Sequence, residues 1–322
     1  MSVPVVAVEG LTKHFPVRRG FLQRQVATVR AVNGVTLAIA PGETLCLVGE
    51  SGCGKSTVGR LILRLMEPTA GTIRLRGTDV THLGPAAMRP HRRHAQMVFQ
   101  DPYSSLNPRL TVGTIVSEPL ENYGDLDAAG RTAKVAALLD RVGLRAEAMN
   151  RYAFEFSGGQ RQRLGIARAL ALDPGLIVAD EAVSALDVSV QAQVLNLQMD
   201  LQEERNIAYL FISHDLGVVE HIGHRIAVMY LGEIVEIASK TELFAAPLHP
   251  YTQALIAAAP VADPRARSER IVLEGDIPSP MNPPAGCRFH TRCPVVIARC
   301  RSEAPLLKTH DQGHAVACHL IG

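Results

Sequence analysis

A glycine-rich run near the start of the chain has the residue types best suited to chemistry. Residues 49–57 read Gly-Glu-Ser-Gly-Cys-Gly-Lys-Ser-Thr and match the phosphate-binding pattern G-x-x-x-x-G-K-S/T, between an apolar stretch and a helical pattern. Glycines let backbone N–H groups turn toward phosphates, and the following helix start adds positive partial charge. We therefore predict that a nucleoside triphosphate binds here, with Lys55 at the β- and γ-phosphates and Ser56 at Mg²⁺. The other predicted loop contacts are Gly49, Glu50, Ser51, Gly52, Cys53, Gly54 and Thr57.

Two adjacent carboxylates end a second apolar stretch, at residues 176–179. Asp180 suits the coordination shell of Mg²⁺, and Glu181 suits positioning or polarising an attacking water. Adjacent strand residues point to opposite sides, so the two roles require the chain to turn where the strand ends. Alone, the pair would more often be solvated acids, but the loop upstream favours the phosphoryl-transfer interpretation.

A second glycine turn stands directly before another helical pattern. Residues 156–161 read Phe-Ser-Gly-Gly-Gln-Arg, so this helix start is also able to receive an anion. Two such helix starts in one chain suggest that two chains share each nucleotide.

The cysteines are unevenly distributed. Cys53 lies beside Lys55 at a helix start, which should favour its thiolate. Four others crowd the C-terminal end, and in a reducing compartment such a cluster suggests a metal site more than disulfides. Their spacing fits neither common zinc sites nor bacterial ferredoxins, so zinc, an iron–sulfur cluster and free thiols all stay open. The residues concerned are Cys287, Cys293, Cys300 and Cys318, with His290 and His319 as the nearest substitute ligands.

The surrounding pattern alternates strands with helices, which predicts an α/β fold with a mainly parallel sheet. Helices are expected at about 55–66, 133–141 and 160–172, within a mostly helical stretch from 112 to 171. Strands are expected at 5–11, 28–32, 35–40, 44–48, 71–76, 97–99, 176–179, 207–212, 225–230 and 233–237.

Composition sets the broad class. With 322 residues, 47% hydrophobic and 20% charged, the chain can build a sizeable core and is not disordered. The formal net charge of +2 gives no electrostatic reason to expect a nucleic-acid partner. No export signal or membrane-spanning run is apparent, so we expect a cytosolic chain. After residue 251 prolines interrupt the pattern, which indicates a small extension that a metal would stabilise.

The order of these motifs resembles the ABC-type ATPases, whose signature is L-S-G-G-Q, here with Phe156 in the first position. The resemblance implies that the signature contacts ATP held by a partner, through Ser157, Gly158, Gly159 and Gln160. It further implies that Phe15 stacks on adenine, that Gln100 joins Ser56 and Asp180 at Mg²⁺, and that His214 contacts the γ-phosphate as a catalytic residue with Glu181. A loop containing Ser184 and Asp187 would cross the dimer interface.

Residues 249–255, 275–280 and 286–294 resemble the C-terminal extension of ATPases from dipeptide and oligopeptide permeases, and residues 182–197 and 211–216 are most similar to the dipeptide-permease F subunit. The fold implied is a P-loop NTPase of ABC type, with a parallel-sheet core, an N-terminal antiparallel β subdomain and a helical signature subdomain at about 105–170. The domains would be an ATPase at 1–250 and an extension at 251–322, whose four cysteines would hold a 4Fe–4S cluster rather than Zn²⁺.

The implied function is ATP hydrolysis that powers import of dipeptides or oligopeptides. Implied partners are a homologous D-type ATPase, two membrane permease subunits and, indirectly, an extracytoplasmic peptide-binding protein, at the cytoplasmic face of the bacterial inner membrane. Alternatives are import of a nickel chelate, glutathione or an oligosaccharide, or a redox-regulated ABC ATPase. A role on DNA or ribosomes is disfavoured, because the chain has neither room for long coiled coils nor a second ATPase unit.

Overall fold

The computed structural model describes residues 3–21, 24–124, 126–259, 273–311 and 313–321. Part of the predicted extension, residues 260–272, lies outside them. The chain divides into two compact units. We call Met1–Val5, Ala40–Gly42 and Leu83–Leu210 the helical unit, and Val6–Ile39, Glu43–His82 and Phe211–Gly322 the phosphate-loop unit.

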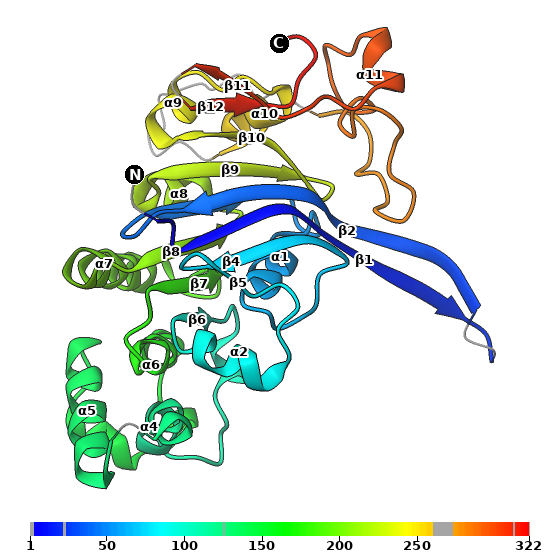
Figure 1. Ribbon diagram of the computed structural model, residues 1–322. Coiled ribbons are helices and arrows are strands. Elements are labelled where there is room, and N and C mark those ends of the chain that lie inside the picture. Colours follow the sequence, from blue (N-terminus) through cyan, green and yellow to red (C-terminus); the bar gives the residue numbers. More distant parts are fainter. Residues whose placement is uncertain (1–2, 22–23, 125, 260–272, 312, 322) are drawn as a thin grey trace. The chain divides into compact units, whose positions relative to one another are not determined.

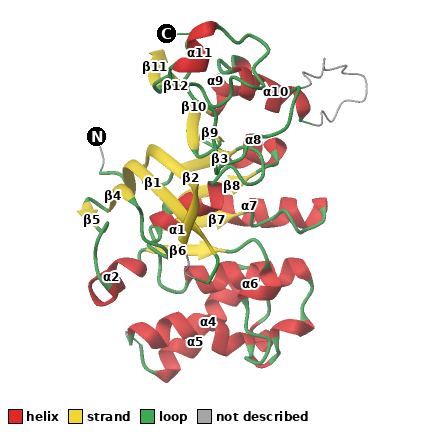
Figure 2. Ribbon diagram, turned by 90° about the vertical axis from the view of Figure 1, so that its right-hand side faces the viewer, coloured by secondary structure: helices red, strands yellow, loops and turns green. Residues whose placement is uncertain are grey.

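The helical unit is built around three helices that pack on one another (Figures 1 and 2): α4 (Val112–Tyr123), α5 (Ala128–Arg141) and α6 (Gly158–Leu170). Val116, Leu139 and Leu164 are fully buried at their inner faces, as expected for apolar residues at helical spacing. The side chains of Thr111, Asp127 and Ser157 cap the three N-termini.

The remainder of the helical unit contains two parallel strands, the long helix α7 and several short helices. Strands β6 (Ala95–Val98) and β7 (Leu176–Asp180) pair in parallel, with Val98 opposite Ala179. The helices are α2 (Pro85–Arg92), α3 (Pro102–Ser105), α7 (Val188–Arg205) and the short 3₁₀ turns Ala146–Asn150 and Ala153–Glu155. The chain leaves this unit within β8 (Ala208–Ser213).

The phosphate-loop unit begins with an antiparallel sheet in the order β2-β1-β4-β5. Its long hairpin, shown in dark blue in Figure 1, consists of β1 (Val6–Arg19) and β2 (Arg24–Ile39). The other two strands are β4 (Ala70–Leu75) and β5 (Thr78–Asp79).

The prediction of three short strands in the first 40 residues is wrong. Gly10 and Gly34 adopt positive φ, at 59° and 72°, and the register shifts along the hairpin. Gly34 therefore sits at an irregularity inside one long strand instead of separating two, and β1 continues well beyond the predicted end at residue 11.

A second group of strands carries the loop itself. Strand β3 (Thr44–Val48), predicted with these bounds, pairs in parallel with β9 (Arg225–Tyr230). Antiparallel strands continue from β9 through β10 (Glu233–Ser239) and β12 (His314–Val316) to β11 (Lys308–Asp311). The end of the predicted extension therefore adds two strands to the sheet beside β10, drawn in red in Figure 1.

Among its described residues, this unit also contains the helices α1 (Lys55–Ile62), α8 (Leu216–Ile222), α9 (Lys240–Ala245), α10 (Pro250–Ala258) and α11 (Ala298–Ser302). Helix α1 ends earlier than predicted, and Arg64 just beyond it has a positive φ of 51°. Across the described ranges, no helix combines the length and the apolar character needed to span a membrane.

Candidate active site

The phosphate loop joins β3 to α1 in a conformation that requires glycine at both ends. Gly49 has φ 149° and Gly54 has φ 112°. A Cβ atom would lie 2.2 Å from the carbonyl oxygen of Met229 at Gly49, and 2.1 Å from that of Ala31 at Gly54. The loop is therefore pressed against the backbones of β2 and β9, where only glycine fits.

Lys55 is buried inside the curve of this loop, with 4% of its surface exposed. Its ammonium group donates hydrogen bonds to the carbonyl oxygens of Gly49 at 2.7 Å and Glu50 at 3.0 Å. Lys55 is also the first residue of α1, whose opening N–H groups have no partners within the helix. The loop thus combines a fixed positive charge with backbone donors, as an anion site requires.

His214 is brought to the same part of the molecule. A cavity of about 420 Å³ is lined by loop residues Gly49 and Glu50 together with His214 and the end of α10. Asp215, the next residue, caps α8 by accepting a hydrogen bond from the N–H of Gly217 at 2.9 Å. Phe15 lies half-buried on β1, with the Lys13 ammonium 5.1 Å from its ring centroid.

The two predicted carboxylates lie in the helical unit, at the end of β7. Asp180 is 3% exposed, whereas Glu181 is partly exposed and has a left-handed φ of 47°. The chain therefore turns where β7 ends, as predicted. Such a backbone conformation costs a non-glycine residue about 1–3 kcal/mol and is concentrated at functional sites.

Gln100 meets Glu181 directly. Its side-chain amide donates a hydrogen bond of 2.8 Å to the Glu181 carboxylate. The main-chain carbonyl of Glu181 also accepts hydrogen bonds from the backbone N–H and the hydroxyl of Ser184, at 3.1 Å and 2.9 Å. The structure thus gathers Gln100, Glu181 and Ser184.

The signature turn forms the start of α6. The Ser157 hydroxyl accepts from the N–H of Gln160 at 3.4 Å, and the Gln160 side chain accepts from the N–H of Ser157 at 3.1 Å. This reciprocal pair is a capping box. Ser157 and Gln160 are nevertheless exposed, while the unusual Phe156 is buried beneath Arg151.

The signature turn and the predicted interface loop are neighbours. A Cβ at Gly158 would lie 3.7 Å from Leu186, and one at Gly159 would lie 2.2 Å from Val190 in the first turn of α7. Asp187 caps α7 by accepting a hydrogen bond from the N–H of Val190 at 2.9 Å, and this bond is the main cause that lowers its pKa. The predicted site residues therefore form two groups, one in each unit.

Sequence reasoning missed two residues that hold the phosphate loop. The Tyr251 hydroxyl accepts a hydrogen bond of 2.9 Å from the N–H of Glu50, and Arg292 forms an ion pair of 2.8 Å with the Glu50 carboxylate. Both lie in segments whose resemblance to permease ATPases was noted, at 249–255 and 286–294. Their contacts join positions far apart in the chain, and no local pattern marks such pairs.

The expectation for Cys53 is wrong in this conformation. Its side chain is 5% exposed, and burial raises the pKa of the thiol although Lys55, with Nζ 3.9 Å from the sulfur, acts to lower it. The cost of desolvating a thiolate exceeds the benefit of the neighbouring ammonium.

The metal-binding expectation for the C-terminal cysteines is not supported. Within the part of the chain that the structure describes, no three or more His, Cys, Asp or Glu side chains form a group able to hold a metal ion. His290 is bonded to the carbonyl of Cys287 at 2.8 Å, and His319 to that of Glu303 at 2.9 Å. Burial, and secondarily the three other thiols, raises the pKa of Cys287 to about 11.

Comparison with known sequences and structures gives consistent matches. Residues 32–184 match the family described as ABC transporter, and residues 235–300 match the oligopeptide/dipeptide transporter C-terminal region. A probable peptide ABC transporter ATP-binding protein of Sinorhizobium fredii is 60% identical over 321 residues, covering 99% of this chain and 91% of that protein. An oligopeptide transport ATP-binding protein of Bacillus subtilis is 54% identical over 319 residues, covering 98% of this chain and 97% of that protein.

Among solved structures, a dimeric ATP-binding cassette in a post-hydrolysis state with ADP and phosphate is 30% identical. It covers 73% of this chain and 98% of its own, with a TM-score of 0.65. The expected ABC cassette fold is confirmed by this similarity.

Proposed function

Because the chain belongs to the ATP-binding subunits of ABC transporters that carry peptides, we propose that residues 49–57 bind the phosphates of MgATP and that Glu181 positions the water that hydrolyses it. The observation that carries this proposal is the buried Lys55 ammonium inside a glycine loop whose cavity is also lined by His214. The hydrolysis powers peptide import.

In this proposal Lys55 exchanges the carbonyl oxygens of Gly49 and Glu50 for phosphate oxygens. The ammonium is charged in both arrangements, but phosphate oxygens carry negative charge and carbonyl oxygens do not, so the exchange adds Coulombic attraction and is favourable. His214 contacts the γ-phosphate from the wall of the same cavity, and Phe15 stacks on the adenine ring.

Glu181 and Gln100 act as a pair. The amide of Gln100 fixes the Glu181 carboxylate, which then accepts a hydrogen bond from the attacking water and orients it. Ser56, Gln100 and Asp180 supply hydroxyl, amide and carboxylate oxygens, the donors that Mg²⁺ prefers. When bound, the ion neutralises charge that develops on the phosphates.

The exposed signature serves a partner's nucleotide. Ser157, Gly158, Gly159 and Gln160 present a helix start and a hydroxyl to solvent. Leu186, in the loop that contains Ser184 and Asp187, lies near Gly158, and we place this loop at the same interface. We propose that the partner is a homologous D-type ATPase beneath two membrane permease subunits, at the cytoplasmic face of the membrane, served by an extracytoplasmic peptide-binding protein.

Reconstitution tests the proposal. The full chain should copurify with the permease subunits and the second ATPase, and peptide uptake into vesicles should require ATP, the binding protein and Lys55. A Lys55→Ala complex that assembles but transports at the normal rate would contradict the site. Uptake of a nickel chelate or an oligosaccharide in place of peptides would contradict the cargo alone.

We also propose, on the resemblance of residues 286–294, that Cys287, Cys293, Cys300 and Cys318 bind a 4Fe–4S cluster. Burial is the main cause that raises the pKa of Cys287, Cys293 and Cys318, and the neighbouring thiols raise it further, which supports the proximity of the four sulfur atoms. Anaerobically purified protein should contain equal iron and acid-labile sulfide. One zinc ion per chain without iron would identify Zn²⁺ as the ligand instead. If neither metal is found, the four cysteines are free thiols and the cluster proposal is wrong.

A further inference from the structure

The only acidic side chain within the phosphate loop is held by an arginine from the far end of the chain. The Arg292 guanidinium binds the Glu50 carboxylate with both terminal nitrogens, at 2.8 Å and 3.0 Å. The Arg292 side chain is 8% exposed and that of Glu50 23%. A bidentate pair with this geometry fixes orientation as well as charge, and its partial burial limits screening by salt.

Aromatic side chains pack near the Arg292 guanidinium, which ends at the Glu50 carboxylate. Its guanidinium carbon lies 5.9 Å from the ring centroid of Tyr230, and Phe289 packs edge-on against Tyr230 at 5.3 Å between centroids. Tyr251 packs against both rings, at 4.7 Å from Tyr230 and 5.4 Å from Phe289. Since Tyr251 also accepts the hydrogen bond from the N–H of Glu50, the same cluster contacts both the backbone and the side chain of this residue.

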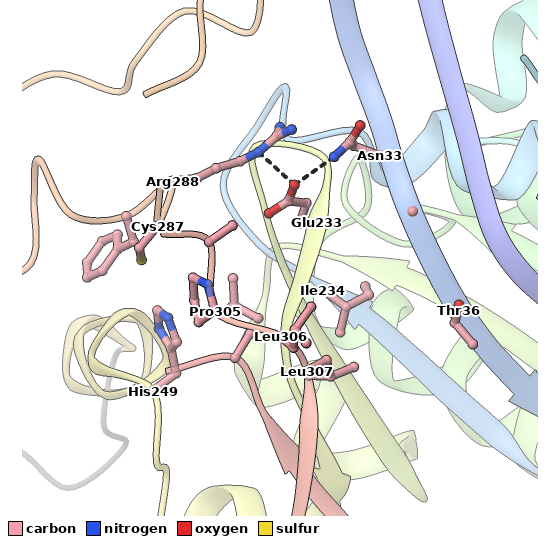
Figure 3. A pocket seen from close by; sticks show the side chains of 15 residues that line it. Asn33, Thr36, Glu233, Ile234, His249, Cys287, Arg288, Pro305, Leu306 and Leu307 are labelled. Carbon is pink, nitrogen blue, oxygen red and sulfur yellow. Dashed lines mark hydrogen bonds and ion pairs between the residues drawn. The ribbon is translucent and has the colours of Figure 1, made fainter. Parts of the chain in front are cut away.

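Arg288 provides a second and separate attachment for this segment. Figure 3 shows Arg288 and Asn33 converging on Glu233, with an ion pair of 2.9 Å and a hydrogen bond of 2.7 Å. Arg288 also donates to the carbonyl of Leu231, and the next residue, Gly232, donates to the carbonyl of Cys53 at 2.9 Å. Arg292 therefore projects from a segment that is already fixed against the turn beneath the loop.

We propose that Arg292 is a positioning residue for the phosphate loop, which holds Glu50 and neutralises it so that the loop accepts the negatively charged triphosphate. The inference rests on the proposed role of residues 49–57. Without Arg292, the Glu50 carboxylate stands uncompensated beside the phosphates and repels them. Glu50 is also free to move, and its carbonyl is one of the two that orient Lys55.

The test measures MgATP binding to the full-length chain in a double-mutant cycle. Arg292→Gln should weaken binding about tenfold in the wild-type background but at most about twofold in the Glu50→Gln background, because the charge it neutralises is then gone. Arg292→Lys keeps the charge and should recover most of the affinity. The matched control, Arg299→Gln, removes an exposed ion pair with Glu303 in the same extension and should change nothing.

In the assembled transporter, Arg292→Gln should raise KM for ATP while kcat at saturating ATP stays close to normal. A merely structural role would lower the amount of active protein, and therefore kcat, and its effect would persist in the Glu50→Gln background. If Arg292→Gln does not fold, the cycle is repeated with Arg292→Lys. Its smaller loss of MgATP affinity must also disappear in the Glu50→Gln background.

The role of Arg292 and MgATP binding by residues 49–57 are contradicted by different results. Normal MgATP affinity in Arg292→Gln, with affinity lost in Lys55→Ala, would overturn the role of Arg292 and leave the phosphate loop in place. Normal affinity in Lys55→Ala as well would overturn the proposed loop itself. An equal loss for Arg292→Gln with and without Glu50→Gln would overturn the action through Glu50.

Discussion

The two glycine turns of this chain begin helices in the same way but are completed differently. At the phosphate loop, Gly49 and Gly54 are pressed against neighbouring backbone, Lys55 is buried, and Glu50 is held by residues from distant segments. At the signature turn, Ser157 and Gln160 satisfy one another and stay exposed.

The difference shows which groups each turn lacks for binding an anion. The phosphate loop has its charge, its shape and its supports within its own unit, so it can bind an anion without further parts. The signature presents a helix start and a hydroxyl but has no buried cation among the side chains of its turn, at residues 156–161. We expect its polar groups to meet a ligand that another chain supplies.

The largest effect should follow from Glu181→Gln. Removing the charge that orients the water should slow steady-state ATP hydrolysis by the assembled complex at least about 100-fold. MgATP affinity should stay unchanged, because the substitution leaves Lys55 and the proposed Mg²⁺ ligands Ser56, Gln100 and Asp180 in place. Glu204→Gln, which removes an exposed ion pair with Arg141 in the helical unit, is the matched control. Hydrolysis near the normal rate in Glu181→Gln would remove Glu181 from the mechanism.

Ser157→Ala tests whether the signature serves a partner. We expect hydrolysis by the complex to fall about tenfold while the separate chain binds MgATP normally, because a charge-assisted hydrogen bond to the partner's nucleotide is lost. The lost cap should also cost about 1 kcal/mol of stability. Ser239→Ala removes a comparable capping box from α9 and should cost similar stability without slowing hydrolysis. Weaker MgATP binding by the isolated Ser157→Ala chain would break the comparison.

Acid should weaken the support of the phosphate loop. His249 accepts the N–H of Tyr251 at 3.1 Å, and burial lowers the pKa of its imidazole from 6.5 to about 4. Between pH 6.5 and about 4, His249 is protonated in the unfolded chain but neutral in the folded chain. The free energy of unfolding is therefore at its full value above pH 6.5 and falls as the pH approaches 4. The total loss is about 3 kcal/mol.

His249→Asn keeps a cap for α10 but takes up no proton. Urea unfolding followed by tyrosine fluorescence should therefore show a steeper loss between pH 7 and 5 for the wild type than for this variant. Equal slopes would mean that His249 does not stay neutral in the folded chain.

The smallest effect concerns the two early cysteines. Burial raises the pKa of Cys46 to about 12, so iodoacetamide should label it only after unfolding. Cys53 should be labelled slowly, and MgATP should slow this further. Mass spectrometry of labelled peptides gives the order, with the half-buried Cys293 and Cys318 reacting first if they hold no metal. Rapid labelling of Cys53 would show that the phosphate loop opens more readily than its packing indicates.

The motifs could be predicted from local sequence patterns. The β3 strand, the loop after it and the turn at Glu181 follow from apolar runs, glycines and a strand-end argument that use only neighbouring residues. The hairpin of β1 and β2 was misjudged in two places: residues 12–27 gave no strand pattern, and Gly34 reads as a break between two strands until pairing makes it an irregularity inside one. Arg292 and Tyr251 were missed because their contacts depend on tertiary packing, which spacing along the chain does not encode.

The contacts of Glu50 have a consequence for recombination between related genes. Its two partners stand 201 and 242 residues further along the chain, so an exchange of C-terminal segments between related genes separates the loop from its supports. A hybrid keeps both contacts only if the incoming segment brings a tyrosine that reaches the N–H of residue 50 and an arginine that pairs with its carboxylate. Selection on the loop is therefore expected to extend to Arg292, in the last tenth of the chain.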